Sequence, residues 1–407
     1  MPQKEHEARG VYTGHFPHPV LLAALPAAVA LQWAASRAPD LVERAYGRRL
    51  YPPIARSVAA VTGRIPLSVG EVLVVAAAGA LVVWLGALAV RLWRGRGARR
   101  RLLLVSAARL LSLGGAGYLV FLLLWGLNYH RAPLAVTAGL GEATAAVSVE
   151  ELEHLCADLV AAANRTRTAV REDPQGVGRL QGGVRDALAR AVPAVAAAAS
   201  AYAPLSAPFA RPKPVLLSTG MSYLGITGIY LPFTAEANVN AIVPASQLPF
   251  TGCHELAHQG GIAPEDEANF LAYAACVRHP DADFRYSGAL NAALYALGAL
   301  AGVDAGRATR LAQWSPAVRR DLDALRAWNE RYRGPAETAA RAVNDAYLKA
   351  QGVPEGVRSY GRMVDLLVLE RRRATRAPAS PGPPTGAAGQ PPARSRRSPR
   401  AARADRG

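Results

Sequence analysis

The sequence predicts a mainly helical membrane protein, in which three N-terminal transmembrane helices precede a helical α+β domain with one small sheet. Three observations support this fold class. Long apolar stretches are concentrated in the first third of the 407 residues. Apolar residues recur at helical spacing through most of the remainder, and two short runs of β-branched and aromatic residues lie near the middle. We therefore divide the chain into a membrane region (1–130), a folded domain (131–372) and a tail (373–407).

Three stretches in the membrane region are long and apolar enough to cross a bilayer. They cover about residues 18–35, 69–90 and 102–127. The first carries Pro26, and a cleaved signal peptide is the alternative interpretation for it. Its long and weakly basic N-terminal flank favours a retained anchor. The sequence thus predicts a multi-pass protein of the cell membrane, with the lipid bilayer as its first partner.

The basic residues of the loops predict an orientation. The link from Arg91 to Arg101 contains six arginines, which is typical of a cytoplasmic loop. An odd number of spans then places the folded domain outside the cytoplasm. The loop 36–66 is also basic, but its arginines alternate with acidic and apolar residues, as in an amphipathic segment that lies on a membrane. We expect an extracytoplasmic domain.

Helical signals dominate the folded domain. Ser148 and Glu151 form a predicted capping box before a helix with apolar residues at helical spacing. A second, alanine-rich helix runs from Val184 to Tyr202, and Pro193 inside it is expected to kink or split it. Three further helices are predicted at about 288–301, 316–332 and 336–350. Residues 225–244 read as strand, turn and strand.

The motif His254-Glu-Leu-Ala-His258 is the part of the sequence that most directly indicates a chemical function. Two histidines four residues apart on a helix lie about one turn from each other, so both imidazoles leave one face and can hold one metal ion. Glu255, beside the first histidine, can then act as a base toward water on that metal. The alternative is a polar helix face with two solvated histidines. The spacing favours a metallopeptidase site.

The segment after His258 offers a third ligand. Thr251 is the predicted N-cap of the first helix, which ends at Gly260-Gly261, and Pro264 begins a second helix that runs to about Val277.

Glu265 opens this second helix, and Glu267 lies about 200° round the helix from it, so only one of them can reach the metal. We choose Glu265, with Asn269 one turn further as a hydrogen-bond partner for a ligand. The alternative is that the acids, including Asp266, merely complement a helix N-terminus.

The pattern H-E-x-x-H followed by E-x-x-A-N resembles the gluzincin metallopeptidases, in which the glutamate completes a His-His-Glu zinc site. The resemblance implies a zincin-like domain, with Zn²⁺ as cofactor and a peptide or protein as substrate. One departure is the short link between His258 and Glu265, because many gluzincins place their glutamate much further along.

A larger set of segments, over about residues 20–370, resembles a bacterial family of multi-pass membrane proteins called domain of unknown function 3810. The segments that carry this resemblance are 125–131 (WGLNYHR), 225–233 (GITGIYLPF), 236–240 (EANVN), 254–259 (HELAHQ), 265–270 (EDEANF) and 286–288 (YSG).

In gluzincins, a strand just before the zinc helix is the sheet edge that binds an extended peptide. By this resemblance, residues 236–240 would form that edge, and Asn238 or Asn240 would hold a peptide carbonyl. An ordinary buried hairpin is the alternative.

Peptide hydrolysis also requires a donor for the oxyanion. Tyr286 is the catalytic candidate that we name, and Tyr360, Arg362 and His279 are alternatives that the sequence does not separate from it.

The C-terminal tail and the cysteines give fewer functional predictions than the motif does. From Ala377 the chain is rich in Pro, Gly, Ser, Ala and Arg, a composition typical of disorder. Much of the net charge of +17 lies there and in the membrane-flanking loops, which favours contact with lipid or cell wall. No nucleic-acid module is found, so no nucleic-acid partner is expected. Cys253 and Cys276 are read as packed thiols, with a disulfide as the alternative outside the cytoplasm.

The sequence therefore favours a membrane-anchored zinc metallopeptidase with ligands His254, His258 and Glu265 and general base Glu255. The competing class is a non-catalytic membrane protein, in which a structural or vestigial metal site supports a binding or signalling module. Hydrolysis of a small amide or ester is a third interpretation.

Overall fold

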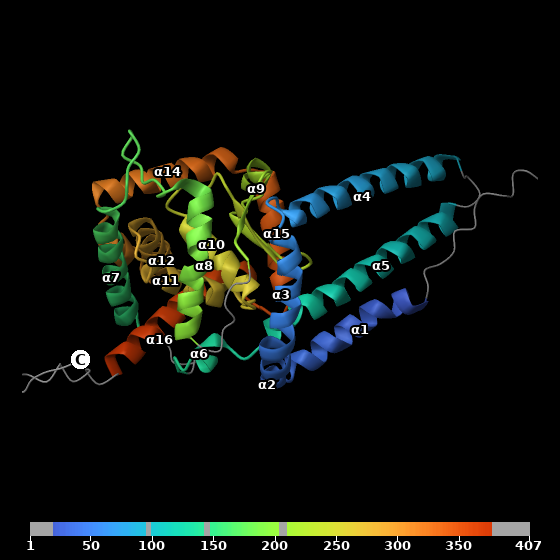
Figure 1. Ribbon diagram of the computed structural model, residues 1–407, viewed down its shortest axis with the longest axis horizontal. Coiled ribbons are helices and arrows are strands. Elements are labelled where there is room, and N and C mark those ends of the chain that lie inside the picture. The colour runs from blue at the N-terminus through green and yellow to red at the C-terminus, as the bar shows by residue number, and fades with distance from the viewer. Residues whose placement is uncertain (1–18, 95–98, 142–146, 203–209, 377–407) are drawn as a thin grey trace, which may run out of the picture.

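The computed structural model describes residues 19–94, 99–141, 147–202 and 210–376. The predicted disordered tail from Ala377 and the centre of the arginine-rich link (95–98) lie outside these residues. The described chain is mainly helical. Helices α1, α4 and α5 leave the folded domain on one side and extend away from it, whereas most other helices form the folded domain together with a small sheet (Figure 1).

The membrane region contains helical structure beyond the three predicted helices, because the segment 39–62 after the first one is also helical. Its elements are α1 (Pro19–Ser36), α2 (Pro39–Leu41), the π-helix η2 (Val42–Leu50), α3 (Tyr51–Thr62), α4 (Val69–Arg94), α5 (Arg99–Leu124) and the 3-10 helix η3 (Gly126–His130). Helix α1 packs along α5, where Leu25 lies against Gly115. Helix α4 lies apart from both where it leaves the domain (Figure 1).

Helices α4, α5 and α12 are long and apolar enough to cross a membrane. In α12 (Ala282–Val303), 61% of the most apolar window is buried inside the domain, so this helix belongs to the core. The second and third predicted spans thus correspond to α4 and α5. The first corresponds to α1, which meets the α2–α3 segment at a bend of 98° and with it forms a broken span or a re-entrant loop.

The folded domain follows η3. Its helices are α6 (Leu134–Thr137), α7 (Val149–Arg167), α8 (Gly183–Ala201), α9 (Ser218–Tyr223), α10 (Leu248–Gln259), α11 (Glu265–Val277), α12, α13 (Ala305–Leu311), α14 (Pro316–Tyr332), α15 (Pro335–Ala350), the 3-10 helix η4 (Gly356–Arg362) and α16 (Met363–Arg376). The predicted capping box is confirmed, since Ser148 Oγ accepts from the Glu151 backbone N–H. Pro193 does not split α8, which runs through it as one helix.

Three short strands form the sheet in the order β1-β3-β2. Strand β3 (Glu236–Asn240) pairs in parallel with β1 (Lys213–Val215) and antiparallel with β2 (Gly228–Leu231). All five residues of β3 are buried, so the prediction that 236–240 is a substrate-binding edge was wrong. A third strand pairs on its other side, and the Asn240 side-chain amide donates to Ser222 and to the Ile226 carbonyl. The open edge nearest α10 belongs to β2.

Helix α10 is the centre of the domain, because every one of its residues is buried. It packs against α8, α11, α12, β2 and β3. Ala268 and Ala272 have no exposed surface and lie on α11, where small side chains permit close approach to α10. The helix begins at Leu248 with Pro249 in its first turn, so Thr251 lies inside the helix and is not the N-cap that we predicted.

Candidate metal centre

A tight reversal between α10 and α11 brings the candidate ligands together. Helix α10 ends at Gln259, as the two glycines predict, and Gly261 adopts a left-handed conformation with φ +91° that favours glycine. The Ile262 N–H bonds to the Ala257 carbonyl, and Pro264 caps α11. Glu265 therefore begins the next helix directly opposite the histidines.

The three side-chain atoms converge at one point. His254 Nε2 and His258 Nε2 are 3.0 Å apart. Glu265 Oε2 lies 3.1 Å from the first and 3.4 Å from the second. Zinc at about 2.0–2.1 Å from each ligand in a tetrahedral site would separate neighbouring ligand atoms by roughly 3.3 Å. The triangle that these atoms form therefore fits a tetrahedral metal ion.

Unpaired buried atoms support the same conclusion. Glu265 Oε2, Glu255 Oε2 and His254 Nδ1 are buried and have no hydrogen-bond partner, although polar atoms in a protein interior are usually paired. His258 Nδ1 lies 2.6 Å from the Ile262 carbonyl oxygen. That contact fixes the proton on Nδ1 and directs the lone pair of Nε2 toward the other ligands.

The pKa values of these residues indicate that the site favours positive charge. Burial opposes a charged His258, but the adjacent Glu265 carboxylate prevails and raises the pKa of His258 to about 9. Burial also opposes ionisation of Glu265, and the two histidines nevertheless hold its pKa well below the usual range. Burial raises the pKa of Glu255 to about 7. A cation between these groups would satisfy the same charge balance.

Glu255 lies between the ligands and strand β2. Its carboxylate touches Gly228 so closely that a Cβ there would collide with it, and it accepts a hydrogen bond from the Tyr230 backbone N–H. The side chain is therefore held against the open edge of the sheet, with one oxygen unpaired. Glu255 therefore lies next to both the candidate ligands and the open edge of the sheet.

Glu267 faces away from the ligands, as the helical period predicts. Its Oε1 accepts a hydrogen bond of 2.7 Å from the Leu134 backbone N–H. Asn269 is buried on α11, and its side chain bonds with the hydroxyl of Tyr295 on α12. Of the two glutamates, only Glu265 belongs to the cluster of possible metal ligands.

Residues from the membrane region anchor the turn that follows the second histidine. Trp125 Nε1 donates to the His258 carbonyl at 3.0 Å, and the Tyr51 hydroxyl donates to the Gln259 carbonyl at 2.7 Å. Arg131 donates to the Gly261 carbonyl at 2.9 Å and pairs with Glu43. We did not predict these roles from the sequence. Trp125 and Arg131 did lie in one of the segments that resembled the family.

The candidate oxyanion donors occupy several places. The hydroxyl of Tyr286 donates to Asp321 at 2.6 Å, in a buried cluster with Arg167. His279 stacks on Phe284. Arg362 pairs with Glu355 at 3.2 Å, and the side chain of Tyr360 lies outside the described part of the chain.

Two other tyrosines, which we did not predict, lie near the third ligand. Burial, followed by the Glu265 charge, raises the pKa of Tyr295 to about 12. Burial and Glu265 also raise the pKa of Tyr347, whose hydroxyl bonds with that of Tyr129. Helical periodicity around Tyr295 and Tyr347 gave no signal, because an aromatic residue on an apolar helix face usually belongs to the core.

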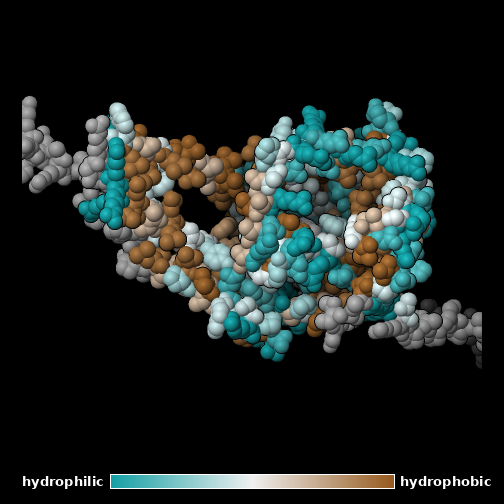
Figure 2. All heavy atoms as spheres, turned by 180° about the vertical axis from the view of Figure 1, so that it is seen from behind, coloured by the Kyte–Doolittle hydropathy of each residue, from teal (hydrophilic) through white to brown (hydrophobic). Residues whose placement is uncertain are grey.

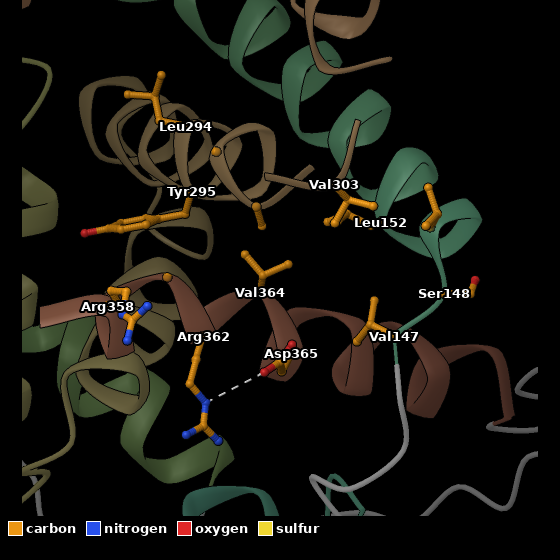
Figure 3. A pocket seen from close by; sticks show the side chains of 14 residues that line it. Val147, Ser148, Leu152, Leu294, Tyr295, Val303, Arg358, Arg362, Val364 and Asp365 are labelled. Atoms are coloured by element: carbon orange, nitrogen blue, oxygen red, sulfur yellow. Dashed lines mark ion pairs between the residues drawn. The ribbon is translucent and has the colours of Figure 1, made fainter. Parts of the chain in front are cut away.

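A groove of about 500 Å³ lies between α7, α12, η4 and α16. Figure 3 shows Tyr295, Arg358 and Arg362 toward one end, and Leu152, Val303 and Val147 toward the other. Arg362 is 3.9 Å from Asp365 within it. Tyr295 thus connects the groove to Asn269 on the ligand-bearing helix.

The thiols are free. Cys253 Sγ and Cys276 Sγ are buried and 3.8 Å apart, without a disulfide between them. This agrees with the interpretation of packed thiols.

Comparison with known proteins identifies the family. Residues 46–368 match the family described as "Protein of unknown function (DUF3810)". The match covers most of the chain, which therefore belongs to this family. No curated protein and no solved structure matches it.

Proposed function

We propose that this protein is a membrane-anchored zinc metallopeptidase. The observation that carries the proposal is the convergence of His254, His258 and Glu265 within hydrogen-bond distance of one another, with Glu255 buried beside them. Two imidazoles and one carboxylate form a donor set that suits zinc. Three protein ligands leave a fourth position open, as in catalytic sites.

Each side chain has a distinct role in this proposal. His254, His258 and Glu265 hold the ion, and bound zinc would acidify a water molecule and polarise the substrate carbonyl. Glu255 accepts the proton from the attacking water and passes it to the leaving amine.

Strand β2 is the proposed substrate edge, in place of β3. Asn240 N–H bonds to the Thr227 carbonyl. Antiparallel alternation then directs the backbone groups of Gly228 and Tyr230 to the open side of β2. A peptide that adds to this edge as a further strand would lie directly beside Glu255.

Tyr295 and Tyr347 are the proposed oxyanion donors. The hydroxyl of Tyr295 bonds with Asn269 on the helix that carries Glu265. The ring of Tyr347 packs on Tyr129, which packs on Trp125 beside His258. Tyr286 was our earlier candidate. Its hydroxyl already donates to Asp321, so we rank it below these two.

The orientation remains a proposal based on the arginine-rich link. Helices α4 and α5 extend from the same side of the domain (Figure 1). The arginines at the far ends of these two helices would therefore lie across the bilayer from the candidate metal centre. A cytoplasmic link places the centre outside.

The alternative is a non-catalytic protein with a structural or vestigial metal site. A structural site is normally closed by a fourth protein ligand. Among the described residues, the cluster of possible ligands contains three side chains, and Glu255 stands beside it with an unpaired oxygen. A structural site does not require such a base, so the observation favours catalysis.

The test uses the full chain in detergent. We expect Glu255→Gln to retain about one zinc per chain by elemental analysis and to lose hydrolysis of a peptide library scored by mass spectrometry. Glu267→Gln is the matched control, because it makes the same change on a glutamate outside the cluster, and should retain both properties. Full hydrolysis by Glu255→Gln would contradict the proposal, and a wild-type chain that holds zinc but cleaves nothing would support the structural alternative.

A further inference from the structure

Five large apolar side chains are exposed around the start of α4. Three of them belong to the folded domain, and two belong to the link between α3 and α4. We call them the collar: Ile65, Leu67, Leu216, Leu217 and Phe233, with exposed fractions of 43%, 48%, 73%, 55% and 51%. They come from three separate segments, namely the α3–α4 link, the β1–α9 link and the β2–β3 turn. Single exposed apolar residues are ordinary, but a contiguous group marks an interaction surface.

Hydrogen bonds hold the three segments at one place. The backbone N–H groups of Leu216 and Leu217 donate to Glu71 in the first turn of α4, at 3.0 and 2.6 Å. Lys213 donates to the Leu67 carbonyl at 2.9 Å.

The β2–β3 turn is tied to α4 by its own contacts. Leu231 packs against Gly70, and Glu236 accepts from the Gly70 N–H at 2.7 Å. All three segments are therefore fixed where α4 leaves the domain.

The apolar surface of the collar continues into that of α4. Val72 and Leu73, one turn into the helix, are exposed by 59% and 51%. Figure 2 shows hydrophobic residues gathered over the helices of the membrane region, while the domain beyond them is largely hydrophilic. Arg64, exposed beside Ile65, supplies a cation at the same level. An apolar surface with a basic side chain at its border is typical of contact with the bilayer interface.

Strand β2 also lies close to the start of α4. Leu231 contacts the domain end of α4, and Tyr230 packs against Trp125 at the domain end of α5, with ring centroids 5.5 Å apart. The strand thus bridges the points where the two candidate spans meet the domain. Glu255 packs against Gly228 and therefore lies beside this strand.

We propose that the folded domain docks on the bilayer through the collar, so that the β2 edge faces peptides at the lipid surface. The proposed docking depends only on the geometry of the collar. Its consequence rests on the proposed function: the substrates would be membrane-associated segments, such as the juxtamembrane part of a membrane protein or a lipid-modified peptide.

Spin labels in proteoliposomes test the docking. The three native cysteines are buried, so Leu216→Cys and Phe233→Cys offer single reactive thiols, with unmodified protein as the blank. Leu85→Cys within α4 is the lipid reference, and Val303→Cys, exposed by 66% at the end of α12 in the folded domain, is the water reference. We expect the collar labels to collide with oxygen more than with a water-soluble nickel chelate, as Leu85 does. Collision ratios equal to that of Val303 would overturn the docking.

A pair of peptides tests the consequence. The same peptide, with and without a palmitoyl chain, is presented with lipid vesicles to wild-type protein and to a Leu216→Ser, Leu217→Ser double variant. We expect wild type to cleave the acylated peptide on the order of tenfold faster, and the variant to lose this preference while it retains zinc. Equal wild-type rates would overturn the substrate class but leave the label result standing. No cleavage of either peptide by zinc-loaded wild type would count against the proposed function itself.

Discussion

Two buried polar clusters of this domain invite comparison. In the first, Arg167 and Asp321 are each 1% exposed and form an ion pair of 2.5 Å, which Tyr286 joins through a hydrogen bond of 2.6 Å. In the second, His254 and His258 are 9% and 5% exposed and converge on a carboxylate. The clusters are buried to a similar degree but differ in how their polar atoms are satisfied.

The difference lies in the hydrogen bonds. Asp321 also accepts from the Gly178 N–H at 2.7 Å, and Arg167 donates to the Gly176 carbonyl at 3.0 Å. The first cluster is therefore complete in itself. The second leaves three buried atoms without partners. A satisfied buried network is complete without a ligand, whereas unpaired buried atoms call for an explanation such as a bound ion or water.

The largest predicted effect is on stability and comes from the first cluster. Arg167→Met leaves Asp321 as an uncompensated buried charge, which we expect to cost about 3–5 kcal/mol in the free energy of unfolding. Chemical denaturation of the detergent-solubilised chain measures it. Zinc bound per folded chain should not change.

The double variant Arg167→Met, Asp321→Leu is the control, since it removes both charges together and should recover much of the lost stability. A single variant as stable as wild type would show that the pair is not a structural centre. Loss of zinc by a folded single variant would show that the two clusters are coupled.

The second prediction concerns the metal ligand itself. Glu265→Gln removes a ligand charge, so zinc affinity should fall by more than the roughly 10- to 100-fold that loss of an outer partner costs. Glu267→Gln keeps an acceptor for the Leu134 N–H and should bind zinc as wild type does. Competition with a fluorescent chelator measures both. Equal losses in the two variants would refute the assignment of Glu265.

The third prediction separates Tyr286 from the catalytic role that we first gave it. Tyr286→Phe removes one hydrogen bond to Asp321, so it should lower the free energy of unfolding by about 1–3 kcal/mol. The rise in melting temperature on zinc addition and the rate of peptide hydrolysis should persist. A stable variant that binds zinc but has lost hydrolysis would restore Tyr286 as a catalytic residue.

The sequence predicted the parts of the site that follow from local periodicity. His254 and His258 share a face because they are one turn apart, and Glu265 and Glu267 diverge because they are two residues apart on a helix. The reversal between the helices followed from Gly260 and Gly261. These features depend on residues within a short stretch of chain, which is why spacing alone was enough.

The rest depends on contacts between distant segments. Strand β3 is central because β1 pairs with it, and β1 has only three residues, one of them a proline, which is too short for strand periodicity to reveal. Tyr347 approaches the site from α15 without any local pattern. Tyr286, by contrast, lay in a segment that resembled the family, and a sequence motif does not distinguish a structural tyrosine from a catalytic one.

The smallest predicted effect tests whether the membrane region positions the metal centre. Trp125→Phe keeps an aromatic ring against Tyr230 and Tyr129 but removes the N–H that bonds to the His258 carbonyl. The loss of one neutral hydrogen bond, about 0.5–1.5 kcal/mol, should weaken zinc binding by roughly two- to tenfold.

Trp328→Phe is the matched control, because the Trp328 indole N–H is buried and has no hydrogen-bond partner. The same substitution there removes no bond and should leave zinc affinity unchanged, as measured by the rate of zinc release to a chelator. Identical release rates from the two variants would mean that the hydrogen bond to the His258 carbonyl does not affect zinc binding. A faster rate from Trp125→Phe alone would mean that the turn after the second histidine is held in place by the end of a candidate membrane span. The membrane region would then be part of the metal centre as well as an anchor for it.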